Sequence, residues 1–506
     1  MSNKFYVTTA IPYVNARPHI GFAMEIIQAD CLARYHKLRG DEVFFLTGTD
    51  EHGSKLYETA KEKGMTAQEL ADENAEHYKD LKDKLNTKYD GFVRTTDEAH
   101  KKGAQKMWKK LSEAGDIYKD TYEGLYCVGC EAYILEKELV EGKCPHHNKE
   151  PEKLEEENYF FKLSKYSDQI KQAIETDELR IVPESRKHEI LNVLKDGLKD
   201  VSFSRPKSNL PWGVDVPDDP DQVMYVWCDA LSNYITAIGY EEETDQFKRF
   251  WPADVHVIGK DILRFHAAIW IGMLIASGLA IPKSILVHGF ITSEGKKMSK
   301  TLGNVVDPDD YASKYGIDAV RYYLLKEIPT TDDGDFSKER FRSVYESDLA
   351  NNVGNLVSRV IAMTGKYFDS RVPESEKNNN LIKTRVDEEW KHYEGALKEL
   401  DMKRALEGVA SLADFANKYV EDTKPWVLAK EDPDRLKDVM YDLLEIIRHL
   451  GLMLTPYIPE AAGKILAYLG MSDDKRDYGK LKEWGGMECS ASINKAEPLF
   501  MRVEEA

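Results

Sequence analysis

The stretch "KFYVTTAIPYVNARPHIGFAMEI", residues 4–26, joins a strand-like segment to the start of a helix-like one. Its first eight residues predict a strand. Apolar residues then recur at helical spacing over 21–40, where Gly40 is a typical helix stop. The next run, "DEVFFLTGTD" at 41–50, predicts a short buried strand. A strand, a helix and a strand in this order predict a right-handed crossover in a parallel sheet.

A second set of such signals lies far downstream. "DVHVIGKD" at 254–261 and "SILVHGFIT" at 284–292 predict strands, and the segment between them predicts a helix. We therefore expect one α/β sheet of the Rossmann type, split by an insertion of different character and followed by an α-helical domain. The expected parts are the first half of the sheet domain at 1–114, the insertion at 115–225, the second half at 226–295, a loop region at 296–350 and the helical domain at 351–506.

The composition places the chain among ordinary globular proteins. It has 506 residues, of which 42% are hydrophobic and 31% charged. No apolar run approaches the ~20 residues of a membrane span, and the first residues go straight into a strand-like pattern, so that no signal peptide is expected. A cytoplasmic location without a membrane partner is therefore expected. The net charge of −19 argues against a protein that coats nucleic acid non-specifically, but it leaves room for a local basic groove.

Two short motifs point to phosphate chemistry. His19 and Gly21 stand between the first strand and the first helix, where free helix N–H groups favour an anion. Downstream, the loop "SEGKKMSKTLGN" at 293–304 places Lys297 and Lys300 three residues apart, so that they can close over a polyphosphate. Each motif alone has a plainer interpretation: a turn with an incidental histidine, and a solvated surface loop.

Three of the six cysteines gather in the insertion. The segment "CVGCEAYILEKELVEGKCPHH", residues 127–147, has the Cys-x-x-Cys and Cys-x-x-His spacing of a tetrahedral structural zinc site. The predicted ligands are Cys127, Cys130, Cys144 and His147, with His146 as the alternative fourth ligand. Four protein ligands leave no open position, so a catalytic role for the metal is not expected.

The motifs "PHIG" and "KMSKT", in this order and each beside its own half of the sheet, resemble the two signatures of class I aminoacyl-tRNA synthetases. The segments "TTAIPYVNARPHIG", "FFLTGTDEHGSK", "YVWCDALSNY", "IGKDILRFH" and "KPWVLAK" are similar to the methionyl-tRNA synthetase family, in a bacterial form with one zinc knuckle. Two positions depart from the signatures: Phe22 stands where most relatives have a second His, and Thr301 where they have Ser. Residues beyond 460 carry no motif.

The resemblance implies an enzyme that activates methionine with ATP, releases pyrophosphate and transfers methionine to the 3′-terminal adenosine of tRNA(Met). His19, Lys297, Lys300 and Mg²⁺ would act on the phosphates, and Gly21, Gly259 and Asp261 would complete the ATP site. Asp50 would pair with the α-ammonium of methionine. The methionine pocket would comprise Asp50 together with Ile11, Tyr13, Trp227, Ala230, Leu231, Tyr234, Ile262 and His266. Without the resemblance, core packing is the simpler interpretation of most of these side chains.

For the helical domain, the resemblance implies that Asn355, Arg359 and Trp426 read the anticodon, because Trp stacks on unpaired bases while Asn and Arg bond base edges. A cap, a surface ion pair and a core indole are the alternatives. A monomer is expected. Three other functions remain open: a nucleotidylyltransferase for a small molecule, a catalytically inactive tRNA-binding relative, and a synthetase for Leu, Ile or Val, which the short insertion disfavours. Our hypothesis for Phe22 is that it packs under the nucleotide while His19, the helix end and the lysines act on the phosphates.

Overall fold

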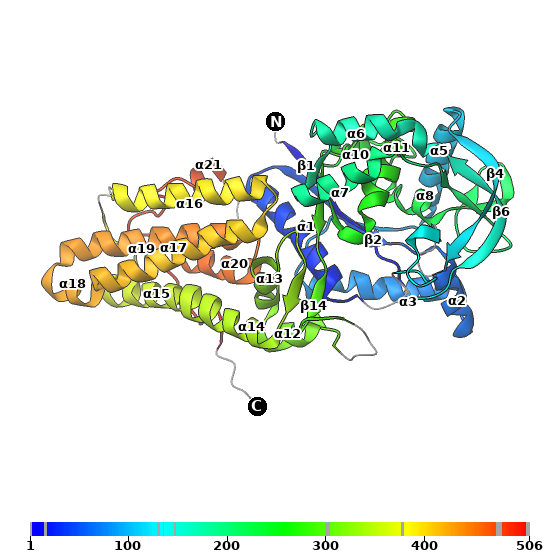
Figure 1. The fold of residues 1–506 in the computed structure, drawn as a ribbon. Coiled ribbons are helices and arrows are strands. Elements are labelled where there is room, and N and C mark those ends of the chain that lie inside the picture. Colours follow the sequence, from blue (N-terminus) through cyan, green and yellow to red (C-terminus); the bar gives the residue numbers. More distant parts are fainter. Residues whose placement is uncertain are drawn as a thin grey trace.

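The computed structural model describes the chain except for residues 1–2, 15–17, 129–131, 135, 146–147, 299–303, 376–378, 472–477 and 502–506, and the side chains of 122–123, 132–133, 137, 154–156 and 297. The molecule is elongated (Figure 1). A helical domain occupies one end, the central sheet lies in the middle, and the long strands β4 and β6 lie at the other end. Among the described helices, none combines the length and the apolar character that a membrane span requires.

The central sheet has six parallel strands in the order β3-β2-β1-β12-β13-β7. The strands are β1 (Lys4–Thr9), β2 (Glu42–Thr49), β3 (Gly91–Arg94), β7 (Arg180–Val182), β12 (Val255–Gly259) and β13 (Ser284–His288). The prediction of one Rossmann-type sheet built from two distant segments is confirmed, because β1 pairs directly with β12. Between these two strands the chain order reverses, and ligands of such sheets bind at that point outside the carboxyl ends of the strands.

Strand β7 is a difference from the expected domain division. It lies inside 115–225, yet it pairs with β13 and forms an edge of the central sheet. Ile181 of β7 is buried and opposite Ile285, so burial of this apolar pair draws the segment into the sheet. A run of three residues is too short to show strand periodicity, and therefore the sequence did not indicate it. The range 115–225 is thus not wholly an insertion outside the sheet.

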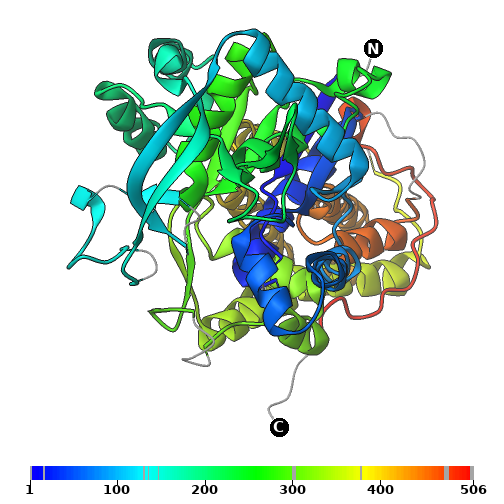
Figure 2. The ribbon, with the colours of Figure 1, turned by 90° about the vertical axis from the view of Figure 1, so that its right-hand side faces the viewer.

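The same range also contains two small antiparallel sheets. One has the order β5-β4-β6-β8 and the other β10-β11-β9. Their strands are β4 (Ile117–Cys127), β5 (Ala132–Ile134), β6 (Glu152–Phe161), β8 (Val201–Ser202), β9 (Ser204–Pro206), β10 (Asp215–Val216) and β11 (Asp219–Met224). In Figure 2, which looks at the molecule from this end, the cyan strands β4 and β6 lie at the periphery.

Helices cover the sheet and connect its strands. They are α1 (Ile20–Leu38), α2 (Ser54–Glu62), α3 (Ala67–Lys79), α4 (Leu81–Lys84), α5 (Glu98–Glu113), α6 (Ser167–Glu175), α7 (Glu184–Lys195), α8 (Val226–Ala230), α9 (Asn233–Thr236), α10 (Asp245–Phe250), the π-helical η4 (Phe265–Trp270) and α11 (Ile271–Ala276), with 3₁₀ turns at η1 (Glu136–Glu138), η2 (Leu163–Tyr166) and η3 (Lys260–Ile262). Helix α1 is buried along most of its length. An apolar helix of this kind must be covered on all sides, here by the sheet and the helical domain.

The predicted helical domain is confirmed. It contains the π-helical η5 (Tyr345–Gly354), α15 (Asn355–Phe368), α16 (Asn380–Lys398), α17 (Met402–Thr423), α18 (Pro425–Glu431), α19 (Pro433–Leu454), α20 (Pro459–Tyr468) and α21 (Tyr478–Leu481). The Asp432 side chain caps α19 by accepting a hydrogen bond from the Arg435 amide, and Pro433 occupies the first turn. Both features favour a helix start.

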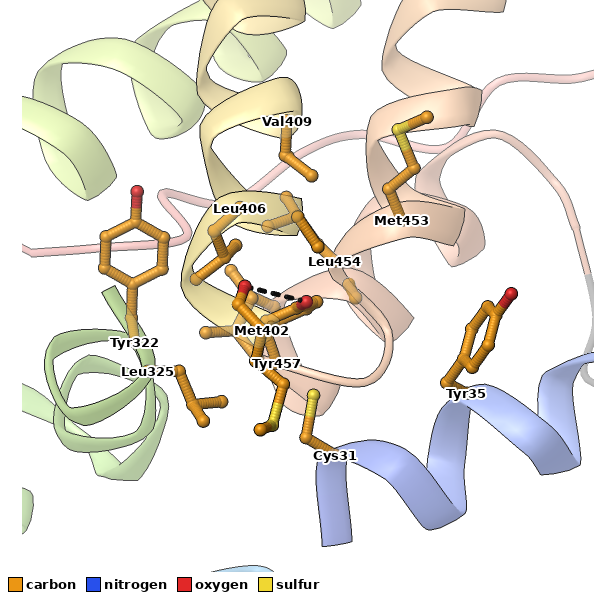
Figure 3. Packing of buried hydrophobic residues seen from close by; sticks show 14 of the residues in the cluster. Cys31, Tyr35, Tyr322, Leu325, Met402, Leu406, Val409, Met453, Leu454 and Tyr457 are labelled. Atoms are coloured by element: carbon orange, nitrogen blue, oxygen red, sulfur yellow. Dashed lines mark hydrogen bonds between the residues drawn. The ribbon is translucent and has the colours of Figure 1, made fainter. Parts of the chain in front are cut away.

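The helical domain and the sheet domain share a hydrophobic interface (Figure 3). Cys31 of α1 lies near Met402 of α17 and Tyr457. The Tyr35 ring meets Tyr393 of α16 edge-on, with 6.0 Å between centroids, and the Tyr457 hydroxyl donates to the Met402 carbonyl at 3.1 Å. Beside them, the fully buried Arg321 of α13 (Ile317–Lys326) donates to Asp30 of α1 at 2.7 Å and to backbone carbonyls that include Tyr457 O. A guanidinium with its donors satisfied ties the two domains together.

Candidate active site

The His19 corner closes the N-terminus of α1. The His19 side chain acts as its N-cap, accepting a hydrogen bond at Nδ1 from the Gly21 amide at 3.1 Å. Desolvation lowers the pKa of His19 below its ordinary value. With Nδ1 as an acceptor, the neutral ring carries its proton on Nε2, which is then free to donate to an anion. The corner therefore combines a side-chain donor with a helix N-terminus.

The His19 ring explains why residue 21 is glycine, without reference to a nucleotide. A Cβ at this position would lie 2.9 Å from Cε1 of the His19 ring, closer than real Cβ contacts. The small residue thus lets His19 fold back over the helix end. The role of Gly21 toward ATP stays a prediction.

Phe22 points to a neighbouring helix. Its ring meets Tyr78 of α3 edge-on, with 5.4 Å between centroids and an interplanar angle of 72°. Such a contact anchors the third residue of α1 against the core cluster. The hypothesis that Phe22 packs under the nucleotide stays a hypothesis.

The lysine loop begins on a third small sheet. The predicted strand 284–292 divides at Gly289 into β13 and β14 (Ile291–Ser293), because the backbone of Asp332 passes so close that a Cβ at 289 would lie 2.2 Å away. β14 pairs with β15 (Lys296–Lys297) and with β16 (Gly334–Phe336). The turn between β14 and β15 is held by Asp335, which accepts from the Gly295 amide at 2.8 Å. Lys300 and the Lys297 side chain lie outside the described residues.

Three helices follow this loop before the helical domain. They are α12 (Pro308–Tyr315), α13 and α14 (Lys338–Val344).

Gly259 and Asp261 stand together after β12. A Cβ at 259 would lie 2.7 Å from Asp261 Oδ1, so the glycine allows the carboxylate to turn back over the strand end. Asp261 is exposed. The carboxyl end of β12 thus presents an exposed carboxylate, as a ribose-binding position requires.

A buried pair that the sequence interpretation missed lies under this edge. Glu25 Oε2 and His288 Nε2 are 2.8 Å apart, and Glu25 Oε1 accepts from the Ala10 amide at 2.8 Å. Burial raises the pKa of Glu25. Burial by itself lowers the pKa of His288, but the hydrogen bond and charge of Glu25, together with the Gly289 carbonyl and the charge of Asp261, raise it above its ordinary value. The pair joins α1 to the ends of β1 and β13. A carboxylate inside an apolar helix was the available signal.

Asp50 follows β2 and is only 5% exposed. Its backbone forms a parallel bridge with Tyr13, in which the Asp50 amide donates to the Pro12 carbonyl at 2.9 Å and the Val14 amide to the Asp50 carbonyl at 3.2 Å. This bridge continues the β1–β2 pairing beyond the strand ends. The structure thereby brings together two residues predicted for one pocket.

Aromatic rings from the second half of the sheet lie against one another. The Trp227 and Phe265 rings stack at 3.8 Å with an interplanar angle of 7°. The His266 ring lies edge-on to Trp227, and its Nε2 is 2.6 Å from the Tyr234 hydroxyl. Trp227, Tyr234 and His266 are therefore grouped as predicted. Phe265 was missed, because in the sequence it is one of many apolar residues of a helix.

His266 is held in one neutral form. Its Nδ1 donates to the Ile262 carbonyl at 3.0 Å, and burial lowers its pKa to about 4. Nε2 is then an acceptor, so the Tyr234 hydroxyl donates to it. The π-helical turn η4, which begins at Phe265, presents this ring. Of the remaining predicted pocket residues, Ala230 and Leu231 are buried, and Ile11 and Ile262 are half-buried.

Cys127 and Cys144 are both buried and each follows a turn or ends a strand. Cys127 ends β4 opposite Ala132 of β5, and Cys144 follows the bridged pair Val140 and Lys143. A buried Cys at a strand end and another after a turn suit the first and third ligand positions of one tetrahedral zinc site. Within the described residues no group of three or more His, Cys, Asp and Glu could hold a metal, but Cys130, His146 and His147 lie outside them. The zinc site stays a prediction.

The three residues predicted to read an anticodon share one surface. Arg359 lies one turn after Asn355 on α15, and its Cζ is 6.0 Å from the centre of the Trp426 ring. Trp426 is 43% exposed, so much of its indole faces solvent. Asn355 lines a hollow together with Asn351, Ser358 and Phe500. The alternative of a core indole is thereby excluded for Trp426.

Comparison with known families covers nearly the whole chain. The family described as "tRNA synthetases class I (M)" matches residues 5–153 and 147–361, and the "Anticodon binding domain of methionyl tRNA ligase" matches 371–506. The methionine–tRNA ligase of Caldanaerobacter subterraneus subsp. tengcongensis is 44% identical, over 100% of this chain and 80% of that protein. That of Rhizobium meliloti is 41% identical, over 99% of this chain and 98% of its own length.

Solved structures agree. Methionyl-tRNA synthetase of Mycobacterium tuberculosis in complex with methionyl-adenylate matches with a TM-score of 0.94 and 38% identity, over 99% of this chain and 100% of that one. The free form of that enzyme matches with a TM-score of 0.89 and 36% identity, over 100% and 99% of the two chains. The chain therefore belongs to the methionyl-tRNA synthetases of class I, the ligases that activate methionine and attach it to tRNA.

Proposed function

We propose that methionine and ATP react at the carboxyl edge of the central sheet to give methionyl-adenylate and pyrophosphate, and that methionine then passes to the 3′-terminal adenosine of tRNA(Met). One observation carries the proposal. Asp50, His19 and Asp261 follow β2, β1 and β12, three adjacent strands of one parallel sheet. Adjacent parallel strands end at one edge, so a carboxylate for an ammonium, a donor for a phosphate and a carboxylate for a ribose meet there.

The first step needs no protein nucleophile. The methionine carboxylate attacks the α-phosphorus, a P–O bond to the leaving pyrophosphate breaks, and negative charge shifts onto pyrophosphate oxygens. His19 Nε2–H donates to a phosphate oxygen, and Lys297 and Lys300 of the loop neutralise the leaving group. Magnesium bound to the ATP phosphates supplies further neutralisation. Catalysis then rests on positioning and charge.

The side-chain pocket suits a thioether. Trp227 and Phe265 offer flat polarizable walls, and sulfur packs favourably against aromatic rings. His266 is neutral and fixed by its two hydrogen bonds, so it adds a polar contact without a charge. Asp50 supports the ammonium end through a charge-assisted hydrogen bond. Shape discriminates a methylene by only ~1–3 kcal/mol, so close analogues of methionine remain competitors.

The tRNA is proposed to contact both ends of the molecule. On α15, Asn355 and Arg359 would bond base edges of the anticodon, and the exposed Trp426 ring would stack on an unpaired base. At the opposite end, a structural zinc held by Cys127, Cys130, Cys144 and His147 would stabilise the insertion. There the ion would only hold the fold, because four ligands close its coordination sphere. We also propose that the protein is a cytoplasmic monomer. Sedimentation of the purified protein tests the monomeric state.

Methionine-dependent exchange of pyrophosphate into ATP is the decisive experiment. We expect exchange with methionine, and Asp50→Asn should lower kcat/KM for methionine about a hundredfold, since a lost partner of a charged group is worth roughly 3 kcal/mol. Asp434→Asn, at an exposed carboxylate of α19, is the matched control and should change nothing. Exchange with another amino acid instead would redirect the proposal to a different synthetase. Its absence with every amino acid would favour an inactive tRNA-binding relative or a small-molecule nucleotidylyltransferase.

A further inference from the structure

A buried chain of hydrogen bonds runs between elements that carry the proposed methionine pocket. Asp229 Oδ2 lies 2.6 Å from His52 Nδ1, and Asp229 Oδ1 lies 2.8 Å from His100 Nε2. The other ring nitrogen of His100, Nδ1, is 2.8 Å from Thr236 Oγ1. His52, His100 and Asp229 are each at most 3% exposed. Buried groups of this kind are retained only with partners, and here every carboxylate oxygen has one.

Two neighbouring members of this series of hydrogen bonds, His52 and Asp229, adjoin pocket residues. His52 is two residues beyond Asp50, and its amide donates to Asp50 Oδ1 at 3.4 Å. Asp229 lies in α8 between Trp227 and Ala230. The ammonium partner comes from the first half of the sheet and the aromatic wall from the second half, so the contact between His52 and Asp229 spans the two halves.

His100 contacts the Asp229 carboxylate through the oxygen that His52 does not use. His100 belongs to α5, whose contact with α9 is so close that a Cβ at Gly103 would lie 2.4 Å from Thr236 Cγ2. This close packing and the hydrogen bond to Thr236 hold His100 in place beside α9. Its Nε2 fixes the orientation of the Asp229 carboxylate from the side opposite His52.

The electrostatics keep Asp229 ionised. Burial by itself raises the pKa of this carboxyl, but the charges and hydrogen bonds of His52 and His100 lower it to about 2. A carboxylate in a desolvated site forms strong hydrogen bonds, which resist displacement.

The Asp50 loop is also anchored within its own half. Glu51 is fully buried and accepts a bidentate pair from Arg94 at 2.7 and 2.8 Å, and its carbonyl accepts from Trp212 Nε1 at 2.6 Å. These contacts hold the loop against β3 and the segment before β10. They lie within the first half of the sheet or on the segment before β10, whereas the contact between His52 and Asp229 reaches α8, the helix that carries Trp227.

We propose that Asp229 and His100 are positioning residues for methionine: they fix the spacing between the Asp50 carboxylate and the Trp227 wall. This inference rests on the proposed function, because it takes these two groups as the methionine contacts. Neither Asp229 nor His100 needs to touch substrate. A misplacement of about 1 Å in such a site can lower the rate about a hundredfold, so a remote hydrogen bond can set the affinity.

The test measures KM for methionine, KM for ATP and kcat in pyrophosphate exchange. Asp229→Asn and His100→Leu should raise KM for methionine at least tenfold while KM for ATP stays within twofold. His100→Gln keeps an N–H near the Nε2 position and should recover most of the methionine KM, a rescue that a merely space-filling role does not predict. The dissociation constant of methionine without ATP, from calorimetry, should follow the same order.

His449→Leu is the matched control, because His449 is an equally buried histidine beside a carboxylate, in the helical domain. It should lower thermal stability and leave KM for methionine unchanged. The inference is overturned if the folded variants keep the wild-type KM for methionine, or if KM for methionine, KM for ATP and kcat worsen together. Should His100→Leu not fold, the isosteric Asp229→Asn decides alone. Failure of the proposed function is distinct, since wild-type protein would then show no exchange with methionine.

Discussion

Two buried carboxylates, Asp229 in the sheet domain and Glu445 in the helical domain, have similarly lowered pKa values. They differ in where their hydrogen-bond partners come from. Burial by itself raises both pKa values, and neighbouring side chains lower each to about 2. Asp229 receives its partners from α5 and the loop after β2, far away in the sequence. Glu445 has its partners Arg448 and His449 on its own helix, α19.

The Glu445 cluster holds residues 481–487 against α19. Glu445 accepts from the Met487 amide at 2.5 Å and the Gly485 amide at 3.1 Å, and Arg448 donates to the Leu481 and Glu483 carbonyls, both at 2.6 Å. It therefore binds a segment without regular structure to a helix. The comparison teaches that a low carboxyl pKa does not mark a catalytic site: what distinguishes Asp229 is which elements it joins.

Breaking the helical cluster should have the largest effect on stability. Arg448→Met leaves Glu445 as an uncompensated buried charge, which costs about 3–5 kcal/mol in the free energy of unfolding. Chemical denaturation followed by circular dichroism measures it. Exchange activity per folded molecule should be unchanged, and a raised KM for methionine in this variant would erase the contrast with Asp229.

Acid should act on the same cluster with a definite sign. The folded pKa of Glu445 lies below its unfolded value of 4.5, so its contribution is fully present above pH 4.5 and is lost as pH falls toward about 2. Wild-type protein should therefore lose about 3 kcal/mol more stability between pH 5 and pH 2 than Glu445→Gln. Urea unfolding at a series of pH values provides the measurement. Parallel curves for the two proteins would contradict it.

A hydrogen bond within the pocket should have a smaller and purely functional effect. Tyr234→Phe removes the donor to His266 Nε2 and leaves that acceptor buried, which should raise KM for methionine about five- to tenfold for a loss of about 1–1.5 kcal/mol. Tyr393→Phe is the matched control, because this buried hydroxyl donates to the Met453 carbonyl in the helical domain. Equal methionine KM values in the two variants would argue against the proposed pocket.

The smallest effect is expected at Phe22. Phe22→His exchanges an edge contact with Tyr78 for a ring that can donate to a phosphate, and the two changes oppose each other. Exchange kinetics should show a change in kcat of no more than about threefold. A full charge-assisted hydrogen bond, at ~1.5–3 kcal/mol, would change kcat by more than about tenfold. A gain of several hundredfold would mean that His19 and the helix end do not suffice at this corner.

The sequence predicted those features that depend on local pattern. The β1–α1–β2 crossover and the helical domain follow from periodicity, and the grouping of Trp227, Tyr234 and His266 from a family resemblance. The interpretation failed where a contact joins distant segments through residues without a local signature. β7 is three residues long, Phe265 is one apolar residue among many, and the Glu25–His288 and His52–Asp229 pairs link positions more than 150 residues apart. The stability that a strand gains by pairing depends on its neighbour as well, so the sequence of one strand alone does not reveal it.

Helix α1 imposes a constraint on length. One unbroken helix runs from the His19 cap to Asp30, which accepts a hydrogen bond from Arg321 of α13, and to Cys31, which packs against the helical domain. Each residue advances an α-helix by about 1.5 Å and turns it by about 100°. Deleting or inserting a single residue between 20 and 30 would thus swing one end out of phase with the other. The number of residues between the two ends of α1 is therefore fixed: substitutions there are tolerated, whereas insertions and deletions are not.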